Sequence, residues 1–177
     1  MDRKNWLQIA CAALVGVSWL PIAAQAQGAA TSKLRSVAVL DFELIGEQNN
    51  PPSKAAQEIR LRNATLQLQR ELVDRQLYRV VDAAPSDELQ LTLRSQHEFL
   101  YDCDECAEQV GRLLGADLVV ATRVQKASEL ILNLNLKIYD VMAQKVVFSK
   151  SVDMLGNEDA SWTRAVRYLV RDMAEKR

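Results

Sequence analysis

Two cysteines, Cys103 and Cys106, are the residues best placed to do chemistry, and acidic residues surround them in the segment Asp102-Cys-Asp-Glu-Cys106. A disulfide here would close a very small loop and would mainly fix local geometry. A redox dithiol would need a stabilised thiolate, which a helix N-terminus favours but the acidic neighbours disfavour. A metal site would need further ligands, and the one histidine is His97. We favour the structural disulfide and keep the redox and metal hypotheses as alternatives.

Other catalytic signatures are missing from the sequence. It has no Gly-x-Ser-x-Gly, HExxH or phosphate-binding glycine-rich motif, and only six glycines in all. Asp41 and Glu43 follow a predicted strand and could ligate a cation or act as a base, but a turn or cap carboxylate is the commoner role. We therefore predict no catalytic residue, no cofactor and no bound metal.

Three arginines, Arg164, Arg167 and Arg171, fall on one stripe of a predicted C-terminal helix. Such a stripe is usually a solvated face, and cations near a helix C-terminus are favourable. The alternative is a basic patch that binds an acidic partner or a phospholipid surface.

The first 26 residues have the features of a secretory signal peptide. Arg3 and Lys4 precede a mostly apolar run from residue 6 to 24, and Ala24-Gln25-Ala26 is a small-x-small exit. We predict cleavage between Ala26 and Gln27 and export to the periplasm. A retained anchor would need roughly 20 apolar residues, a length that this run barely reaches. Cys11 lacks the preceding leucine of a lipidated cysteine, so we expect no stable membrane anchor after cleavage.

The predicted mature chain is nearly neutral. It holds 20 lysines and arginines (22 less Arg3 and Lys4) against 22 acidic residues (23 less Asp2), which gives no basic excess for nucleic acid. Processing would leave Cys103 and Cys106 as an even pair in an oxidising compartment, which again favours a disulfide.

The elements that would position these residues form one α/β domain over residues 35–177, after a flexible lead-in at 27–34. We predict a mixed sheet of about five strands with helices packed on it, in the order β-α-β-α-α-β-β-β-α. Alternation is clearest at 130–139, and residues 43–54 are expected to be a long loop with a functional role. The predicted strands are 35–42, 77–82, 117–124, 130–139 and 146–153, and the predicted helices are 55–76, 88–96, 103–114 and 160–175.

The predicted helix at 55–76 has two apolar stripes. A broad one contains Leu61, Ala64, Leu68 and Leu72, and a narrower one on nearly the opposite face is formed by Ile59, Leu66 and Val73. Either another helix of the same domain covers the narrow stripe, or it is a contact surface for a partner chain.

Several strings resemble the secreted bacterial families catalogued as domains of unknown function 2380 and 3280. They are Val37-Ala-Val-Leu-Asp-Phe-Glu43, Cys103-Asp-Glu-Cys-Ala107, Leu114-Gly-Ala-Asp-Leu-Val119, Gly156-Asn-Glu-Asp-Ala-Ser-Trp162 and Tyr168-Leu-Val-Arg171. More distantly, the chain is similar to the amino-terminal domain of TolB and to curli-secretion and penicillin-binding-protein-activator lipoproteins. The chain departs from them in lacking a lipobox and in having Ala143-Gln144 where a turn glycine is expected.

The resemblance implies a periplasmic α/β domain that acts by contacting other envelope proteins. We therefore predict a non-enzymatic, exported accessory protein with an envelope protein as its partner, and make no prediction of its oligomeric state. The candidate contact surfaces are the Ile59/Leu66/Val73 stripe, the 43–54 loop and the arginines of the last helix. The alternative is a periplasmic thiol redox or metal-carrier protein that uses Cys103 and Cys106.

Overall fold

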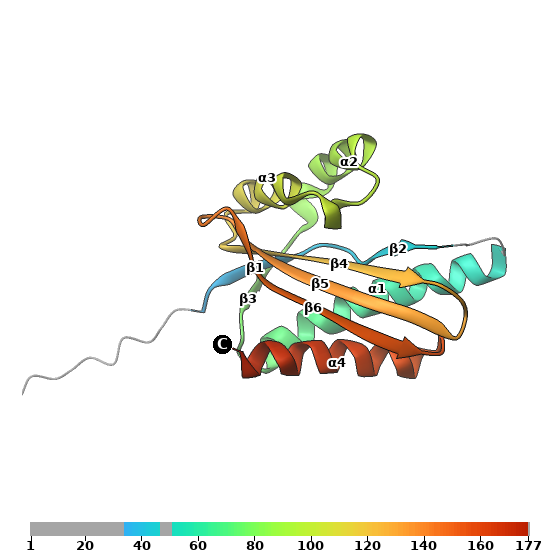
Figure 1. The fold of residues 1–177 in the computed structure, drawn as a ribbon. Coiled ribbons are helices and arrows are strands. Elements are labelled where there is room, and N and C mark those ends of the chain that lie inside the picture. Colours follow the sequence, from blue (N-terminus) through green and yellow to red (C-terminus); the bar gives the residue numbers. More distant parts are fainter. Residues whose placement is uncertain (1–33, 47–50, 177) are drawn as a thin grey trace, which may run out of the picture. The chain divides into compact units, whose positions relative to one another are not determined.

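A mixed six-stranded sheet, described over residues 34–46 and 51–176 of the computed structural model, organises the molecule (Figure 1). The predicted signal peptide, its cleavage position and nearly all of the lead-in lie outside these residues. In the described part of the chain, no helix is long and apolar enough to cross a membrane. The strands are β1 (Ser36–Val39), β2 (Glu43–Ile45), β3 (Arg79–Val81), β4 (Leu118–Lys126), β5 (Ile131–Asp140) and β6 (Lys145–Leu155).

The topology combines a crossover with a meander. The strand order is β3-β1-β4-β5-β6, and β2 pairs with β4 beyond the end of β1. Strand β1 is parallel to both β3 and β4, whereas β4, β5 and β6 are antiparallel to one another. This arrangement confirms the predicted single α/β domain with a mixed sheet.

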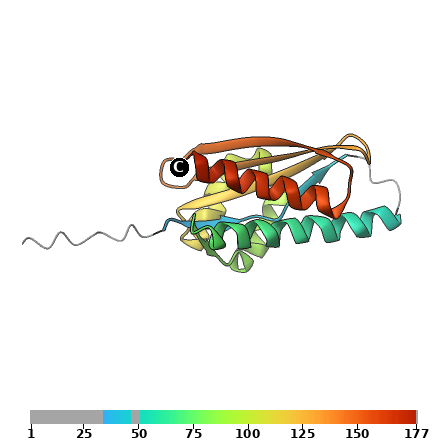
Figure 2. The ribbon, with the colours of Figure 1, turned by 90° about the horizontal axis from the view of Figure 1, so that it is seen from below.

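The helices are divided between the two faces of the sheet (Figures 1 and 2). Helices α1 (Pro51–Asp74) and α4 (Asp159–Glu175) lie side by side on one face, and α2 (Asp87–Gln96) and α3 (Asp104–Leu114) lie on the other. Short 3-10 turns, η1 (Ala84–Ser86) and η2 (Leu100–Asp102), lead into α2 and α3. Helix α3 ends at Gly115, which has the left-handed conformation that glycine adopts without strain.

Alternation along the central strands builds two apolar cores. On β5, Leu132, Leu134, Leu136 and Ile138 are buried in the core beneath α1 and α4. The smaller core on the other face contains Val119, Tyr139 and residues of α3, including both cysteines. The sheet is therefore covered on both faces at its β1 and β4 strands, as expected for buried parallel strands.

The segment 43–54 corrects the sequence prediction, because it is not a loop throughout. Glu43–Ile45 is a sixth strand, and α1 already begins at Pro51, where the missing N–H of proline is tolerated. Val39 pairs with Val120, and Glu43 pairs with Arg123. The three residues between Val39 and Glu43 therefore lie opposite only two residues of β4. This extra residue acts as a bulge, which breaks the two-residue period that marks a strand.

The turn between β5 and β6 explains why a glycine is expected there. Gln144 has a φ of 51°, in the left-handed region that non-glycine residues rarely occupy. Its side chain donates a hydrogen bond to Glu108 on α3, with 2.8 Å between Nε2 and Oε1. The chain thus places a glutamine in a strained position and gives its side chain a partner.

Acid should weaken the fold at Asp117, which joins the starts of β1 and β4. Oδ2 of Asp117 accepts hydrogen bonds of 2.7 Å from both Oγ and N of Ser36, and these hold the pKa of the Asp117 carboxyl below its usual range. A lowered folded pKa contributes stability above the unfolded pKa of about 3.9, and this is lost as pH falls through the folded value. We expect Asp117→Asn to lower the urea midpoint at pH 7 and the difference from wild type to shrink below pH of about 4.

Glu98→Gln is the matched control for this prediction, because it removes one charge from an exposed side chain. Urea unfolding across the acid range, followed by circular dichroism, provides the comparison. A constant difference between wild type and Asp117→Asn at every pH would contradict the assignment.

Candidate functional site

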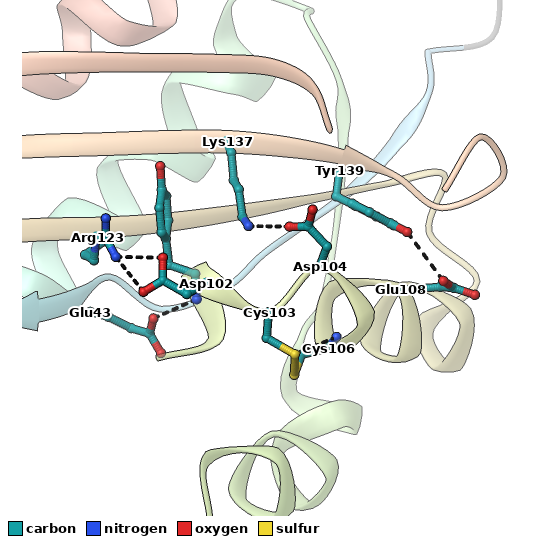
Figure 3. Close-up of polar contacts among 10 residues, drawn as sticks. Glu43, Asp102, Cys103, Asp104, Cys106, Glu108, Arg123, Lys137 and Tyr139 are labelled. Atoms are coloured by element: carbon teal, nitrogen blue, oxygen red, sulfur yellow. Dashed lines mark hydrogen bonds and ion pairs between the residues drawn. A yellow bond between two sulfur atoms is a disulfide. The ribbon is translucent and has the colours of Figure 1, made fainter. Parts of the chain in front are cut away.

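The cysteine-bearing segment contains a disulfide between Cys103 and Cys106 (Figure 3). The Cα atoms are 5.2 Å apart, and Cys103 is the N-cap of α3, where its Sγ accepts a hydrogen bond of 3.1 Å from the backbone N of Cys106. Both cysteines are buried in the smaller core. The predicted disulfide is confirmed, and its place at a helix start and in a core suits a structural bond.

The acidic residues beside the cysteines form ion pairs with the sheet. Asp102 binds Arg123 of β4, with both carboxylate oxygens within 2.7 Å of Nη1, and Asp104 pairs with Lys137 of β5 (Figure 3). Glu108 pairs with Arg112 at 2.6 Å within α3. Asp102 and Asp104 are therefore compensated by basic groups from the sheet, and Glu108 by a basic group of its own helix.

Glu43 attaches the start of this segment to β2. Its two carboxylate oxygens accept hydrogen bonds of 2.9 Å from the backbone N–H groups of Leu100 and Tyr101 in η2. The Tyr101 ring packs against Arg123 and Lys137. Its centroid lies 4.4 Å from Cζ of Arg123 and 5.0 Å from Nζ of Lys137. Glu43 thus has the capping role that is commoner for such a carboxylate, and the polar groups of this cluster hold the segment on the sheet.

The structure also brings His97 close to the cysteines. The possible ligand atoms of His97, Cys103 and Cys106 all lie within 4.8 Å of one another. The histidine is exposed, whereas both sulfurs are used in the disulfide. These three residues could bind a thiophilic cation such as Zn²⁺ only after reduction of the disulfide, because thiolates are the metal ligands.

We expect the disulfide to be hard to reduce and modest in its effect on stability. Thiol titration of native protein without residues 1–26 should find no free thiol, and a reductant should release both thiols only after unfolding, because both cysteines are buried. Cys103→Ser combined with Cys106→Ser should lower the free energy of unfolding by at most about 2 kcal/mol, because the closed loop is short. Rapid reduction in native buffer would contradict the structural role.

The narrow stripe of α1, formed by Ile59, Leu66 and Val73, lies open to solvent. The three residues are 59%, 41% and 51% exposed, whereas Leu68 and Leu72 on the opposite face are fully buried. The hypothesis that another helix of the same domain covers this stripe is therefore wrong for the described chain. The stripe remains a candidate contact surface.

The arginines of α4 do not form one free basic patch. Arg167 pairs with Glu71 of α1 at 3.3 Å, and Arg171 lies 3.8 Å from Glu175. Arg164 donates a hydrogen bond of 2.9 Å to Oγ of Ser161, and it makes no ion pair with a carboxylate in residues 34–46 and 51–176. Of the three predicted residues, Arg164 alone has no carboxylate partner among the described residues.

A groove between β6 and α4 is the feature that sequence reasoning missed. It has a volume of about 350 Å³ and is lined mainly by apolar groups from the end of β6 and the first turns of α4. The sequence does indicate the two elements, but their relative placement is set by the folded sheet. The lining residues are Val152, Asp153, Met154, Leu155, Ser161, Arg164, Ala165 and Tyr168.

Comparison with known proteins gives a family and a fold. The family model DUF3280, described as "Protein of unknown function (DUF2380)", matches residues 35–173, which confirms the resemblance seen in the sequence. Among curated proteins, none matches this chain.

Solved structures resemble the chain at low sequence identity. A PelC dodecamer from Paraburkholderia phytofirmans is 13% identical, with a TM-score of 0.51 over 79% of this chain and 89% of that chain. The LpoB C-terminal domain from Salmonella enterica is 16% identical, with a TM-score of 0.44 over 71% and 87%. Lipoprotein GNA1162 from Neisseria meningitidis is also 16% identical, with a TM-score of 0.44 over 80% and 99%. At this identity, the PelC likeness shows a shared fold and nothing more.

Proposed function

We infer that this chain, which belongs to the DUF3280 family, is an exported, non-enzymatic accessory domain that acts by binding another protein of the bacterial envelope. The observation that carries this proposal is the exposed apolar stripe of α1, formed by Ile59, Leu66 and Val73. The opposite face of α1 packs into the core of the domain, so an exposed row of apolar side chains on this face suits a contact surface.

The geometry of the stripe fits a helical or flat apolar partner surface. Its members are seven residues apart, so they fall on nearly the same side of α1 at intervals of about 10.5 Å. Heptad spacing is the pattern with which one helix packs along another. Helix α1 is long enough, at 24 residues, to present all three side chains while its other face covers the sheet.

The proposed compartment is the periplasm. The predicted signal peptide would export the chain, and the disulfide between Cys103 and Cys106 suits an oxidising environment. The polar clusters described above are used in structural contacts, which supports a binding role over a catalytic one.

The direct test is capture of partners from a periplasmic extract. Wild-type protein should retain a specific partner, and the triple variant Ile59→Gln, Leu66→Gln, Val73→Gln should lose it, because glutamine preserves helix propensity but removes the apolar surface. Arg62→Gln with Arg70→Gln is the matched control on exposed neighbouring positions. Identical partner profiles for all three proteins would contradict the proposed surface.

Self-association is one form that the contact could take, since PelC is recorded as a dodecamer. Sedimentation of wild-type and triple-variant protein separates this from a different envelope partner. A wild-type assembly that dissociates in the triple variant would identify a second copy of the chain as the partner.

The alternative function is a thiol redox or metal-carrier protein. The grouping of His97 with Cys103 and Cys106 within 4.8 Å favours it. Titration of Zn²⁺ into protein treated with a dithiol reductant, compared with His97→Ala, is the test. Tight binding that depends on His97, together with free thiols in protein purified from the periplasm, would favour the alternative.

A further inference from the structure

Strand β6 is the long open edge of the sheet. Among the described strands it ends the order β3-β1-β4-β5-β6 and has 11 residues, whereas β3 at the opposite edge has three. Proteins usually protect such an edge with proline, bulges or a covering segment. Val147 is an extra residue opposite the Ile138–Tyr139 step, so the bulge protects only the beginning of β6. The remainder of β6 pairs regularly with β5. Among the described residues its other side is open from Phe148 to Asp153, whereas the carbonyl of Leu155 accepts a hydrogen bond of 2.8 Å from Oγ of Ser161 on α4.

The hydrogen-bonding register shows which backbone groups of β6 face outward. The carbonyl of Ile131 accepts a hydrogen bond from the N–H of Ala127, so the peptide groups of Ile131 face β4. Because peptide groups alternate sides along a strand, those of Leu132, Leu134 and Leu136 face β6 and bond to their partners there. The outward-facing peptide groups in the regular part of β6 are therefore those of Ser149, Ser151, Asp153 and Leu155, and the first three have no hydrogen-bond partner among the described residues.

The β6–α4 groove runs beside this open edge. Met154 and Ala165 are buried in its floor, and Leu155 and Tyr168 at its rim are 81% and 41% exposed. A strand added to β6 would place alternate side chains toward α4, and an apolar side chain suits this lining.

The charge of the groove selects the partner. The carboxylate of Asp153 accepts a hydrogen bond of 2.7 Å from Nδ2 of Asn133. The guanidinium of Arg164, in contrast, has no carboxylate partner among the described residues. A carboxylate on the incoming segment would form an ion pair with the guanidinium of Arg164. A second copy of β6 would bring two cations, Lys145 and Lys150. Its one carboxylate, that of Asp153, is already hydrogen-bonded to Asn133, so a second copy suits Arg164 less well than an acidic segment does.

We propose that the open edge of β6 and the β6–α4 groove bind an extended peptide segment of a partner protein by strand addition. The incoming segment forms hydrogen bonds with the outward backbone groups of Ser149, Ser151 and Asp153. It places an apolar side chain in the groove and a carboxylate next to the guanidinium of Arg164. This proposal rests on the proposed function and names the chemistry of the partner segment.

The test selects peptides from a random linear library displayed on phage, using full-length purified protein. The selected peptides should alternate apolar residues and carry an Asp, a Glu or a free terminal carboxylate. The affinity of the best synthetic peptide is then measured by fluorescence anisotropy. Ser151→Pro should weaken it by about tenfold or more, because proline removes one outward N–H of the edge.

Ser151→Ala is the matched control for the edge. It loses the side-chain hydrogen bond from Ser151 to Asn133 but keeps the backbone N–H, so its affinity should stay within about twofold of wild type. Arg164→Glu lies on an exposed helix position, so it tests the groove even if the proline variant does not fold. It should weaken binding by about tenfold, and replacing the peptide carboxylate with lysine should restore it.

Failure to select any peptide, or equal affinity of wild type, Ser151→Pro and Arg164→Glu, would overturn the proposal. The same variants in the periplasmic capture separate this from the proposed function. A partner that is lost only with the α1 triple variant would leave the proposed function intact and exclude the groove. A capture profile unchanged by every variant would contradict both surfaces.

Discussion

Replacing Trp162 with alanine is expected to lower the free energy of unfolding by about 4 kcal/mol, which would be the largest effect of a single substitution considered for this protein. Trp162 lies in the first turn of α4, is 3% exposed, and belongs to the main core beneath the sheet. Its truncation would remove a large apolar side chain and leave a cavity that the rigid sheet cannot fill. Urea unfolding, followed by far-ultraviolet circular dichroism so that the signal does not depend on the tryptophan, measures the lost free energy of unfolding.

The indole also closes a buried polar network. Its Nε1 donates to Oδ1 of Asn157 at 2.9 Å, and Nδ2 of Asn157 donates at 2.8 Å to both Gln57 of α1 and Glu129. Trp162→Phe keeps most of the apolar volume and breaks only the indole hydrogen bond, so it should cost about 1–2 kcal/mol. Equal losses for phenylalanine and alanine would show that the network, and not the core packing, dominates.

Replacing Gly111 with valine is expected to cost about 3 kcal/mol, because α3 packs against the sheet at this residue without space for a side chain. A Cβ at Gly111 would lie 2.4 Å from Cγ2 of Val141 and 2.9 Å from Cγ2 of Val119. Both valines are buried, so the helix must move away from the sheet. Thermal and urea unfolding of the variant measure the cost.

Relief of the clash provides the control. In the double variant Gly111→Val, Val141→Ala, the closest contact is removed, so the two substitutions should be clearly non-additive, with the double variant losing less than the sum of the single losses. Gly115→Ala, at the end of the same helix, has no neighbouring atom within 4 Å of the added Cβ, and only its φ of 60° should make it unfavourable. A Gly111→Val variant as stable as wild type would contradict the close packing of α3.

Several features of the fold follow from the sequence because they depend on neighbouring residues. The alternation from Leu130 to Tyr139 predicts β5 within a residue at each end, since the sheet buries one side of the strand. Gly115 predicts the end of α3 because a left-handed C-cap strongly favours glycine. The expected glycine at Gln144 is explained in the same way, by a positive φ in the turn.

The sequence was less informative where local patterns are broken. The three-residue strand β2 is too short for an alternating pattern, and the bulge between β1 and β2 shifts the face that each side chain takes. The lack of periodicity around Pro51 predicts a loop, although proline is well suited to the first turn of a helix. The two apolar stripes of α1 were visible in the sequence, but which of them is covered depends on the placement of α4.

The candidate site divides in the same way. By itself, the sequence favours a disulfide between Cys103 and Cys106, because a helix start brings residues three apart within bonding reach, but it leaves the redox and metal hypotheses open. Only the tertiary structure decided that Asp102 and Asp104 are neutralised by Arg123 and Lys137, which are 21 and 33 residues away. It also decided that the Ile59/Leu66/Val73 stripe is exposed and that β6 has an open edge beside Arg164. The physical reason is that short-range geometry is set by backbone periodicity, whereas ion pairs, coverage and free edges depend on how distant segments pack together.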